Sequence, residues 1–203
     1  SLMNVSLIQT GTSYTGSLNI EKNIFKFGYE PSSDYYIMNY YPVYLDHTLT
    51  SNADNITIKD NLVMGDSLST ATYPRYGITV ASSTSVNLEN NDFVTIDNNT
   101  IKNVTYAAIF SAISTNPSST TPNNIKVTNN YINNIKTYSS YGYGIYSSSK
   151  TGSLVKQNTI INPSVIGIAL LDDNGENQNI ASENIVYNTT NNNNVPLRIT
   201  RTA

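Results

Sequence analysis

The chain has 203 residues and a formal net charge of −3, and only 12% of its residues are charged. It has no Cys and one His, which excludes a disulfide framework, a thiol nucleophile and a multi-histidine metal site. It also lacks the basic excess of a nucleic-acid-binding protein and any apolar run of the roughly 20 residues that a membrane span needs. Its 31 Asn and 48 Ser plus Thr disfavour helix and indicate short strands joined by turns.

One short pattern recurs along the whole chain: an apolar residue, two further residues, Asn, one residue and a second apolar residue. The successive Asn are 38, 38, 31, 28 and 26 residues apart, and a short apolar strand, often opened by Gly, follows each copy after a variable gap. In chain order the copies are Ile20–Asn23–Phe25, Ile58–Asn61–Val63, Ile96–Asn99–Ile101, Val127–Asn130–Ile132, Val155–Asn158–Ile160 and Ala181–Asn184–Val186. The strands that follow them are 43–45, 77–80, 108–110, 144–146, 167–170 and 197–199.

The repeat predicts that successive units stack into parallel sheets around a shared apolar interior, because strands this short cannot bury a face alone. Asn tolerates the αL conformation of a tight corner. Its amide can also hydrogen-bond to the Asn of the next unit and so form a ladder. We therefore expect each repeated Asn to lie in a tight turn. The alternative is an antiparallel β-sandwich with Asn-rich turns, although hairpins do not require a fixed Asn.

The six Asn-centred units and the Gly-Ile strands after them resemble the right-handed parallel β-helix of the pectin-lyase-like superfamily, over essentially the whole chain. The resemblance implies an all-β solenoid of about six coils with an Asn ladder. It makes the segment before each Asn the second strand of a coil and the Gly-Ile strand the first strand of the next. The superfamily includes pectate lyases, polygalacturonases, alginate epimerases, phage tailspikes and non-catalytic surface proteins, so it leaves the activity open.

The chain shows no linker and no break in composition, so we expect residues 1–203 to form a single domain. Both ends look cut, because 5–8 already alternates like a strand and the chain stops soon after Ile199. An open solenoid end exposes unpaired backbone. We therefore expect a fragment of a longer protein, or a homo-oligomer such as a trimer that covers the ends.

In this superfamily the ligand face is the sheet of first strands, and the period of two predicts which of their residues point outward. Tyr and Phe rings offer apolar faces to sugars, with a hydroxyl to hydrogen-bond. An insertion at 138–143 adds Tyr141 and Tyr143. This aromatic stripe is the candidate polysaccharide-binding surface, and the alternative is that Tyr simply favours strands. The outward column is predicted to be Tyr44, Thr79, Phe110, Tyr146, Ala169 and Arg198.

Asp172 and Asp173 close one Gly-Ile strand. Two carboxylates there could bind Ca²⁺ or supply acid and base for glycoside cleavage, but the run 172–175 is equally a turn. Lys150 and Arg198 lie on or near the same predicted face, and the resemblance implies that a lyase would use such a residue as its base, beside a positive charge that neutralises a uronate. These four residues are the candidate catalytic set, and the alternative is ordinary surface charge.

The leading hypothesis is an extracellular or virion-surface protein, like a tailspike or an adhesin, that binds a polysaccharide on its Tyr-lined face. One alternative is a polysaccharide lyase or glycoside hydrolase that uses the four candidate residues. Another is a structural shaft that is rigid because of its stacked Asn and apolar rows. We expect no nucleic-acid partner and no membrane span, and Ca²⁺ is the one cofactor for which the carboxylates suggest a place.

Overall fold

The structure is a computed structural model, which describes residues 4–10, 17–27, 39–46, 55–65, 74–81, 93–113, 125–136, 142–149, 152–172, 179–187 and 195–201. Strands are the regular elements of these residues, which contain no helix. They form three sheets, A, B and C, in which every pairing is parallel. The expectation of an all-β fold with stacked parallel strands is therefore confirmed, and the antiparallel sandwich is wrong.

Each sheet takes every third strand of the chain. Sheet A contains β1 (Asn4–Thr10), β4 (Asn39–Asp46), β7 (Tyr76–Ala81), β10 (Ala107–Ile113), β13 (Tyr143–Ser149), β16 (Ile166–Asp172) and β19 (Val195–Arg201). Sheet B contains β2 (Leu18–Glu21), β5 (Asn55–Lys59), β8 (Phe93–Asp97), β11 (Ile125–Thr128), β14 (Ser153–Lys156) and β17 (Ile180–Ser182). Sheet C contains β3 (Ile24–Phe27), β6 (Leu62–Gly65), β9 (Thr100–Val104), β12 (Tyr131–Ile135), β15 (Thr159–Ile161) and β18 (Ile185–Tyr187).

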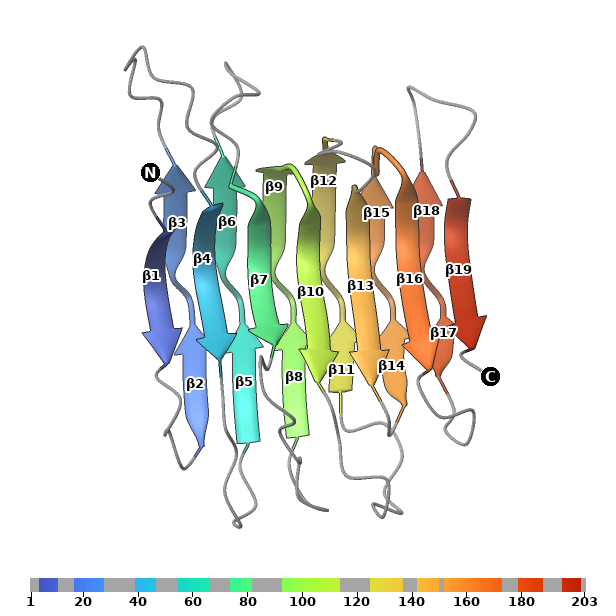
Figure 1. The fold of residues 1–203 in the computed structure, drawn as a ribbon, viewed down its shortest axis with the longest axis horizontal. Helices are drawn as coiled ribbons and strands as arrows, with labels where there is room; N and C mark the ends of the chain where they lie inside the picture. The colour runs from blue at the N-terminus through green and yellow to red at the C-terminus, as the bar shows by residue number, and fades with distance from the viewer. Residues whose placement is uncertain are drawn as a thin grey trace.

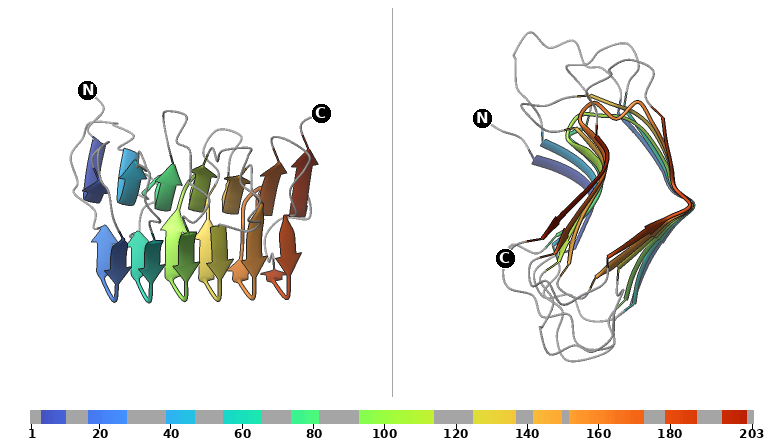
Figure 2. Two further views of the ribbon diagram at one scale, coloured as in Figure 1. Left: turned by 90° about the horizontal axis from the view of Figure 1, so that it is seen from below. Right: turned by 90° about the vertical axis from the view of Figure 1, so that its right-hand side faces the viewer.

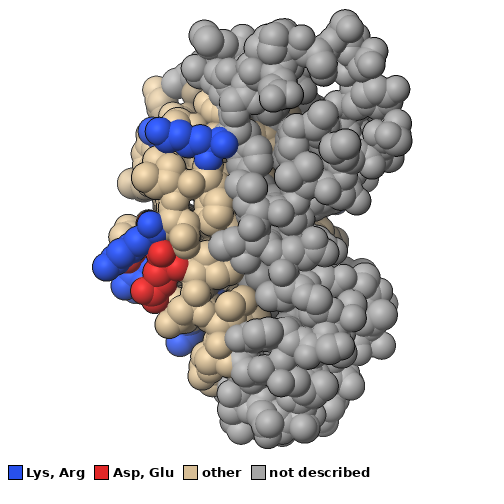
Figure 3. Space-filling model, turned by 90° about the vertical axis from the view of Figure 1, so that its left-hand side faces the viewer, with Lys and Arg blue, Asp and Glu red and all other residues tan. Residues whose placement is uncertain are grey.

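The chain thus repeats a unit of three strands, one from each sheet, which we call a triplet. Triplets stack side by side along the longest axis of the molecule (Figure 1). Seen along this axis, sheets B and C meet at a sharp corner and sheet A lies across from them (Figure 2). At the end formed by β1 to β3, charged side chains lie on the surface that sheets B and C provide (Figure 3).

The corner between sheets B and C is made by the residue before each repeated Asn. Residues at this position have φ between 51° and 58°, the αL conformation, and they are Lys22, Asp60, Asn98, Asn129, Gln157 and Glu183. Each repeated Asn therefore lies in the tight turn, directly after the residue that adopts αL. The chain changes direction at the residue before each repeated Asn. The Asn side chain then points into the corner, where it forms hydrogen bonds.

The repeated Asn form a continuous ladder inside the corner. The Oδ1 atom of Asn130 accepts hydrogen bonds from both the backbone N–H (2.9 Å) and the Nδ2 (3.0 Å) of Asn99. The Nδ2 atom of Asn130 donates in turn to Oδ1 of Asn158 and to the Ile96 carbonyl, at 2.9 Å each. The same bonds recur from Asn23 to Asn184. The predicted ladder is confirmed, and Asn suits it because its side-chain amide offers two N–H donors and a carbonyl oxygen that accepts two bonds.

A second row of Asn lies where sheet C strands end. Asn103, Asn134 and Asn162 have φ of 57°, 62° and 54°. Asn134 Nδ2 donates to Asn103 Oδ1 (2.6 Å), and Asn103 Nδ2 donates to the Gly65 carbonyl (2.9 Å). Each of these Asn follows a ladder Asn by four residues, so an Asn-x-x-x-Asn spacing in three consecutive repeats was the signal that could have predicted this second corner.

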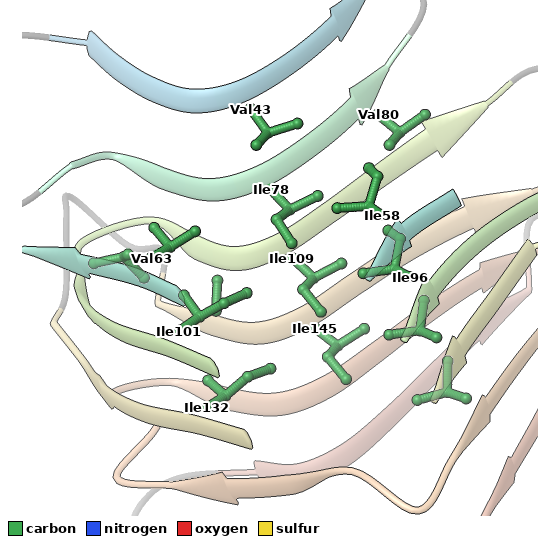
Figure 4. Packing of buried hydrophobic residues seen from close by; sticks show 14 of the residues in the cluster. Val43, Ile58, Val63, Ile78, Val80, Ile96, Ile101, Ile109, Ile132 and Ile145 are labelled. Carbon is green, nitrogen blue, oxygen red and sulfur yellow. The ribbon is translucent and has the colours of Figure 1, made fainter. Parts of the chain in front are cut away.

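The core lies between the three sheets and consists of apolar rows that run along the axis (Figure 4). The two apolar positions of the repeated pattern supply one row each. Sheet B contributes Ile20, Ile58, Ile96, Val127 and Val155. Sheet C contributes Phe25, Val63, Ile101, Ile132 and Ile160. Sheet A adds Val43, Ile78, Ile109, Ile145 and Ile168. All these side chains are buried, so the pattern identified the core correctly.

Sheet A is bent, and its concave side faces away from sheets B and C (Figure 2). The bend coincides with the Gly of the Gly-Ile strands. A Cβ at Gly144 would lie 2.6 Å from the Gly167 carbonyl oxygen and 2.7 Å from Cγ2 of Ile160, so this position also points into the core. Two successive inward residues break the alternation of a flat strand. Gly occupies this place in three of the strands, where a Cβ would come close to a backbone oxygen of the next strand and to a side chain of sheet C, and Ala108 occupies it in β10.

Candidate functional site: the outer face of sheet A

The predicted outward column lies in register across sheet A. Tyr44, Thr79, Phe110, Tyr146, Ala169 and Arg198 are paired in this order on neighbouring strands. Phe110 and Tyr146 are half-buried, Thr79 and Ala169 are buried, and Arg198 is exposed. The side chain of Tyr44 and the whole of Tyr141 lie outside the described residues. The alignment follows the prediction, whereas the binding role of these residues stays a prediction.

Five rings on this face form what we call the aromatic cluster: Tyr76, Tyr106, Phe110, Tyr143 and Tyr146. Phe110 and Tyr146 stack at 4.8 Å with an angle of 13° between the rings. Tyr106 directly precedes β10. Its ring centroid lies 4.8 Å from that of Tyr76, 6.2 Å from that of Phe110 and 6.1 Å from that of Tyr143. The bend of sheet A brings its two halves together, so that Tyr143 and Tyr146 of the same strand lie 5.4 Å apart.

The stacked pair limits what a ligand can touch. The facing surfaces of Phe110 and Tyr146 cover each other, so a sugar can stack only on their remaining faces. Tyr76 meets Phe110 edge-on at 65°, and Tyr143 meets Tyr106 edge-on at the same angle; Tyr76 is buried, whereas Phe110, Tyr106 and Tyr143 are half-buried. The cluster therefore offers a mixture of ring faces, ring edges and Tyr hydroxyls, which suits a ligand with both C–H and O–H groups.

Arg75 adds a positive charge to one side of the aromatic cluster. Its guanidinium carbon lies 5.6 Å from the ring centroid of Tyr76 and 5.0 Å from that of Tyr106, within the range of cation–π attraction. Residues 74–75 lie directly before β7, so the loop that enters this strand places the arginine. Because the side chain is half-buried, its contact with two rings holds Tyr106 in a fixed orientation.

One buried hydroxyl faces the same column. Thr79 is 2% exposed, and its Oγ1 has no hydrogen-bond partner among the described residues. Its strand neighbours Ile78 and Val80 belong to the core, so Thr79 points to the outer side. In register it lies between Tyr44 and Phe110. A buried polar atom without a partner is uncommon in folded proteins and adds a hydrogen-bonding group beside the rings.

The candidate catalytic residues are only partly described. Asp172 pairs with Arg201 and Arg198 pairs with Ala169, so Asp172 lies three residues, about 10 Å, further along the strands than Arg198. The Nε atom of Arg198 donates to Oγ1 of Thr200 at 3.3 Å. Lys150, Asp173 and the side chain of Asp172 lie outside the described residues. Catalysis by this set stays a prediction, and so does the Ca²⁺ site.

The described part of the chain lacks two kinds of feature. No three His, Asp or Glu side chains there come together in a way that could hold a metal ion. No helix there is long and apolar enough to cross a membrane.

Tyr76, Tyr106 and Arg75 were missing from the predicted binding surface. Tyr76 and Tyr143 each stand directly before the Gly of a Gly-Ile strand, which was the available signal. A flat strand would turn Tyr76 toward the core, because it lies two residues before the inward Ile78. The bend at Gly77 instead places the Tyr76 ring beside Phe110, on the outer side of sheet A.

No family model matches the chain, and neither does any curated protein or solved structure. The protein is therefore classified from its own fold and its own aromatic cluster. It belongs to the class of all-β proteins in which three parallel sheets enclose an apolar core, with an Asn ladder at one corner, and it carries an aromatic cluster on the concave side of sheet A.

Proposed function

We propose that the triplets are the coils of a right-handed parallel β-helix of about six coils, similar to those of the pectin-lyase-like superfamily. Three parallel sheets that each take every third strand support this proposal. So does the buried ladder of Asn at one corner. In that fold the outer face of the first-strand sheet, here sheet A, is the ligand face.

The function is the binding of a polysaccharide on the outer face of sheet A, by a protein exposed outside a cell or on a virion. The observation that carries this function is the aromatic cluster, because its rings come from three adjacent strands and gather on a concave surface. Rings at the spacing of parallel strands, about 4.8 Å, form a stripe along the molecular axis. A stripe of this kind suits a linear polymer of units with both apolar C–H faces and hydroxyl groups.

The concave shape supports a ligand that lies in a groove. Phe110, Tyr143 and Tyr146 are each half-buried, so their rings are partly enclosed and still accessible. Half-buried rings are already held by their neighbours, so they lose little conformational freedom when a ligand binds. The Arg75 contact with Tyr76 and Tyr106 adds to this rigidity.

A glycan array followed by calorimetry on the tightest-binding glycan tests this function. We expect Phe110→Ala and Tyr146→Ala each to weaken binding roughly tenfold, because each removes one ring of the stacked pair. Tyr131→Ala is the matched control, because Tyr131 is a half-buried strand tyrosine on sheet C. An array without any bound glycan, or affinities that respond equally to Tyr131→Ala and Tyr146→Ala, would contradict the proposal.

A further inference from the structure

The outer face of sheet C combines positive charge with exposed apolar side chains. Its described strands, β3, β6, β9, β12, β15 and β18, contain no Asp or Glu. Lys26 on this face is exposed, and Lys102 is half-buried with its Nζ 5.7 Å from the ring centroid of Tyr131. Lys136, which follows β12, is exposed as well. No described carboxylate on this face neutralises these lysines.

Apolar residues surround the lysines in two rows. The ends of the rows are the most exposed, with Ile24 at 66%, Ile185 at 61% and Tyr187 at 58%. One row is Ile24, Leu62, Thr100, Tyr131, Thr159 and Ile185, and the other is Lys26, Met64, Lys102, Asn133, Ile161 and Tyr187. The outer face of sheet C is therefore positively charged and largely apolar.

Sheet B, on the other side of the corner, has a different surface. Its outer row alternates in charge and reads Glu21, Lys59, Asp97, Thr128, Lys156 and Ser182. Lys156 forms an ion pair with Glu183 at 3.0 Å, and Asp97 accepts a hydrogen bond from Thr128 at 2.7 Å. In Figure 3 the red atoms lie near and below the corner, and the upper part formed by sheet C shows blue without red. With Lys126 in the neighbouring outer row, the sheet B strands hold three lysines and two carboxylates, so most of the charge on sheet B is compensated, whereas the described strands of sheet C hold lysines alone.

The positive charge argues against a second copy of this chain as the partner. Two sheet C faces brought together would place lysines against lysines, and sheet B offers no net negative charge in exchange. An acidic soluble polymer would use the lysines but would leave the Ile and Tyr side chains in water.

We infer that the outer face of sheet C binds to a membrane surface that contains anionic lipids. Lysines beside such a surface are attracted to the negatively charged headgroups, and each contributes about fivefold to the affinity. Tyrosines favour the headgroup region, and exposed isoleucines gain from contact with the acyl boundary. The protein would bind as a rigid plate lying on the membrane without inserting a segment.

Sedimentation with sucrose-loaded vesicles tests the inference on the full chain. We expect binding to phosphatidylglycerol–phosphatidylcholine vesicles, none to phosphatidylcholine alone, and release by high salt. The double variant Lys26→Gln/Lys102→Gln should weaken binding by about 25-fold. Lys59→Gln/Lys126→Gln on sheet B is the matched control, because it removes the same net charge and a comparable lysine–ring contact (Lys126 to Phe93, 5.9 Å). It should stay within about twofold of the parent protein.

Three results would overturn the inference: no binding to the anionic vesicles, an equal loss in both double variants, or retention of full binding by the sheet C variant. Binding of soluble heparin that depends on Lys26 and Lys102, without vesicle binding, would assign the face to an acidic polymer instead. Phe110→Ala should leave vesicle binding unchanged, because its ring lies on sheet A, so this inference and the proposed polysaccharide site stand or fall separately.

Discussion

An interior triplet and the last triplet carry the same sequence pattern in different surroundings. In the interior, Val127, Asn130 and Ile132 are 0%, 1% and 0% exposed. At the C-terminal end of the described stack, the equivalent Ala181, Asn184 and Val186 are only partly buried. A pocket of about 330 Å³ opens there, lined by residues that include Ile168, Val186 and Leu197. The same pattern is therefore enclosed in one place and open to water in the other.

The difference shows that part of what stabilises each triplet comes from the next one. Asn130 accepts two hydrogen bonds from Asn99 and donates to Asn158 and to the Ile96 carbonyl. Asn184 also accepts two, from Asn158, and donates to the Val155 carbonyl, but no later triplet covers it among the described residues. In a stacked repeat the stability is a sum over neighbouring pairs. Equal substitutions in the two places therefore measure what a following triplet contributes to the stability of the one before it.

The largest difference is expected for the ladder. Asn130→Ala leaves the buried N–H of Asn99 without an acceptor and removes two donated bonds, so it should lower the free energy of unfolding by about 3–4 kcal/mol. Asn184→Ala removes the acceptor of the N–H of buried Asn158, but Asn184 is itself only partly buried, so water can take the place of its side chain and about 1 kcal/mol is expected. Urea unfolding followed by circular dichroism measures both.

Equal costs for Asn130→Ala and Asn184→Ala would show that the last triplet is as well enclosed as the interior. Asn98→Ala is a useful companion variant, because Asn98 is exposed and adjacent to ladder residue Asn99. Its side chain contacts Asp60 at the surface, so its loss should cost much less than the loss of Asn130.

The ladder and the core rows could be predicted because they depend on local repetition. The spacing of Asn61, Asn99 and Asn130 set the register, and the flanking Ile and Val defined the two apolar rows that the structure buries. The corner conformation could not be assigned to the right residue, because Lys, Asp, Asn, Gln and Glu all occupy it. No residue type marks that position, since the fold imposes its conformation.

The candidate site was predictable only in part, for a geometric reason. Phe110 and Tyr146 followed from alternation along a strand, and the pairing of β10 with β13 places them side by side. Tyr76 and Tyr106 could not follow from alternation, because the bend puts both Ala108 and Ile109 into the core and shifts the outward positions before it. Arg75 precedes its strand, where no periodicity applies. A bend that depends on packing between sheets A and C is not visible in a single strand.

A smaller difference is expected for the apolar rows. Val127→Ala removes two methyl groups from a fully buried side chain and leaves a cavity, which should lower the free energy of unfolding by about 2.5 kcal/mol. Val186→Ala makes the same chemical change beside the pocket, where less contact is lost, and about 1 kcal/mol is expected. The comparison uses the same urea unfolding measurement. If Val186→Ala lowered the free energy of unfolding more than Val127→Ala, Val186 would be at least as well enclosed in solution as Val127.

The smallest difference is expected at the bend of sheet A. A Cβ at Gly144 would lie 2.6 Å from the Gly167 oxygen and 2.7 Å from the fully buried Ile160, so Gly144→Ala should cost about 2 kcal/mol. A Cβ at Gly167 would meet Val186 at 2.5 Å and the Pro196 oxygen at 2.6 Å, but both lie at the open end and can shift, so about 1 kcal/mol is expected. Ala108 occupies the corresponding place in β10, so a methyl group fits there when its surroundings are adjusted. If Gly144→Ala left thermal unfolding unchanged, the backbone of the interior triplets would adjust as easily as that of the last one, and the contrast between the two regions would then depend on the ladder and the apolar rows.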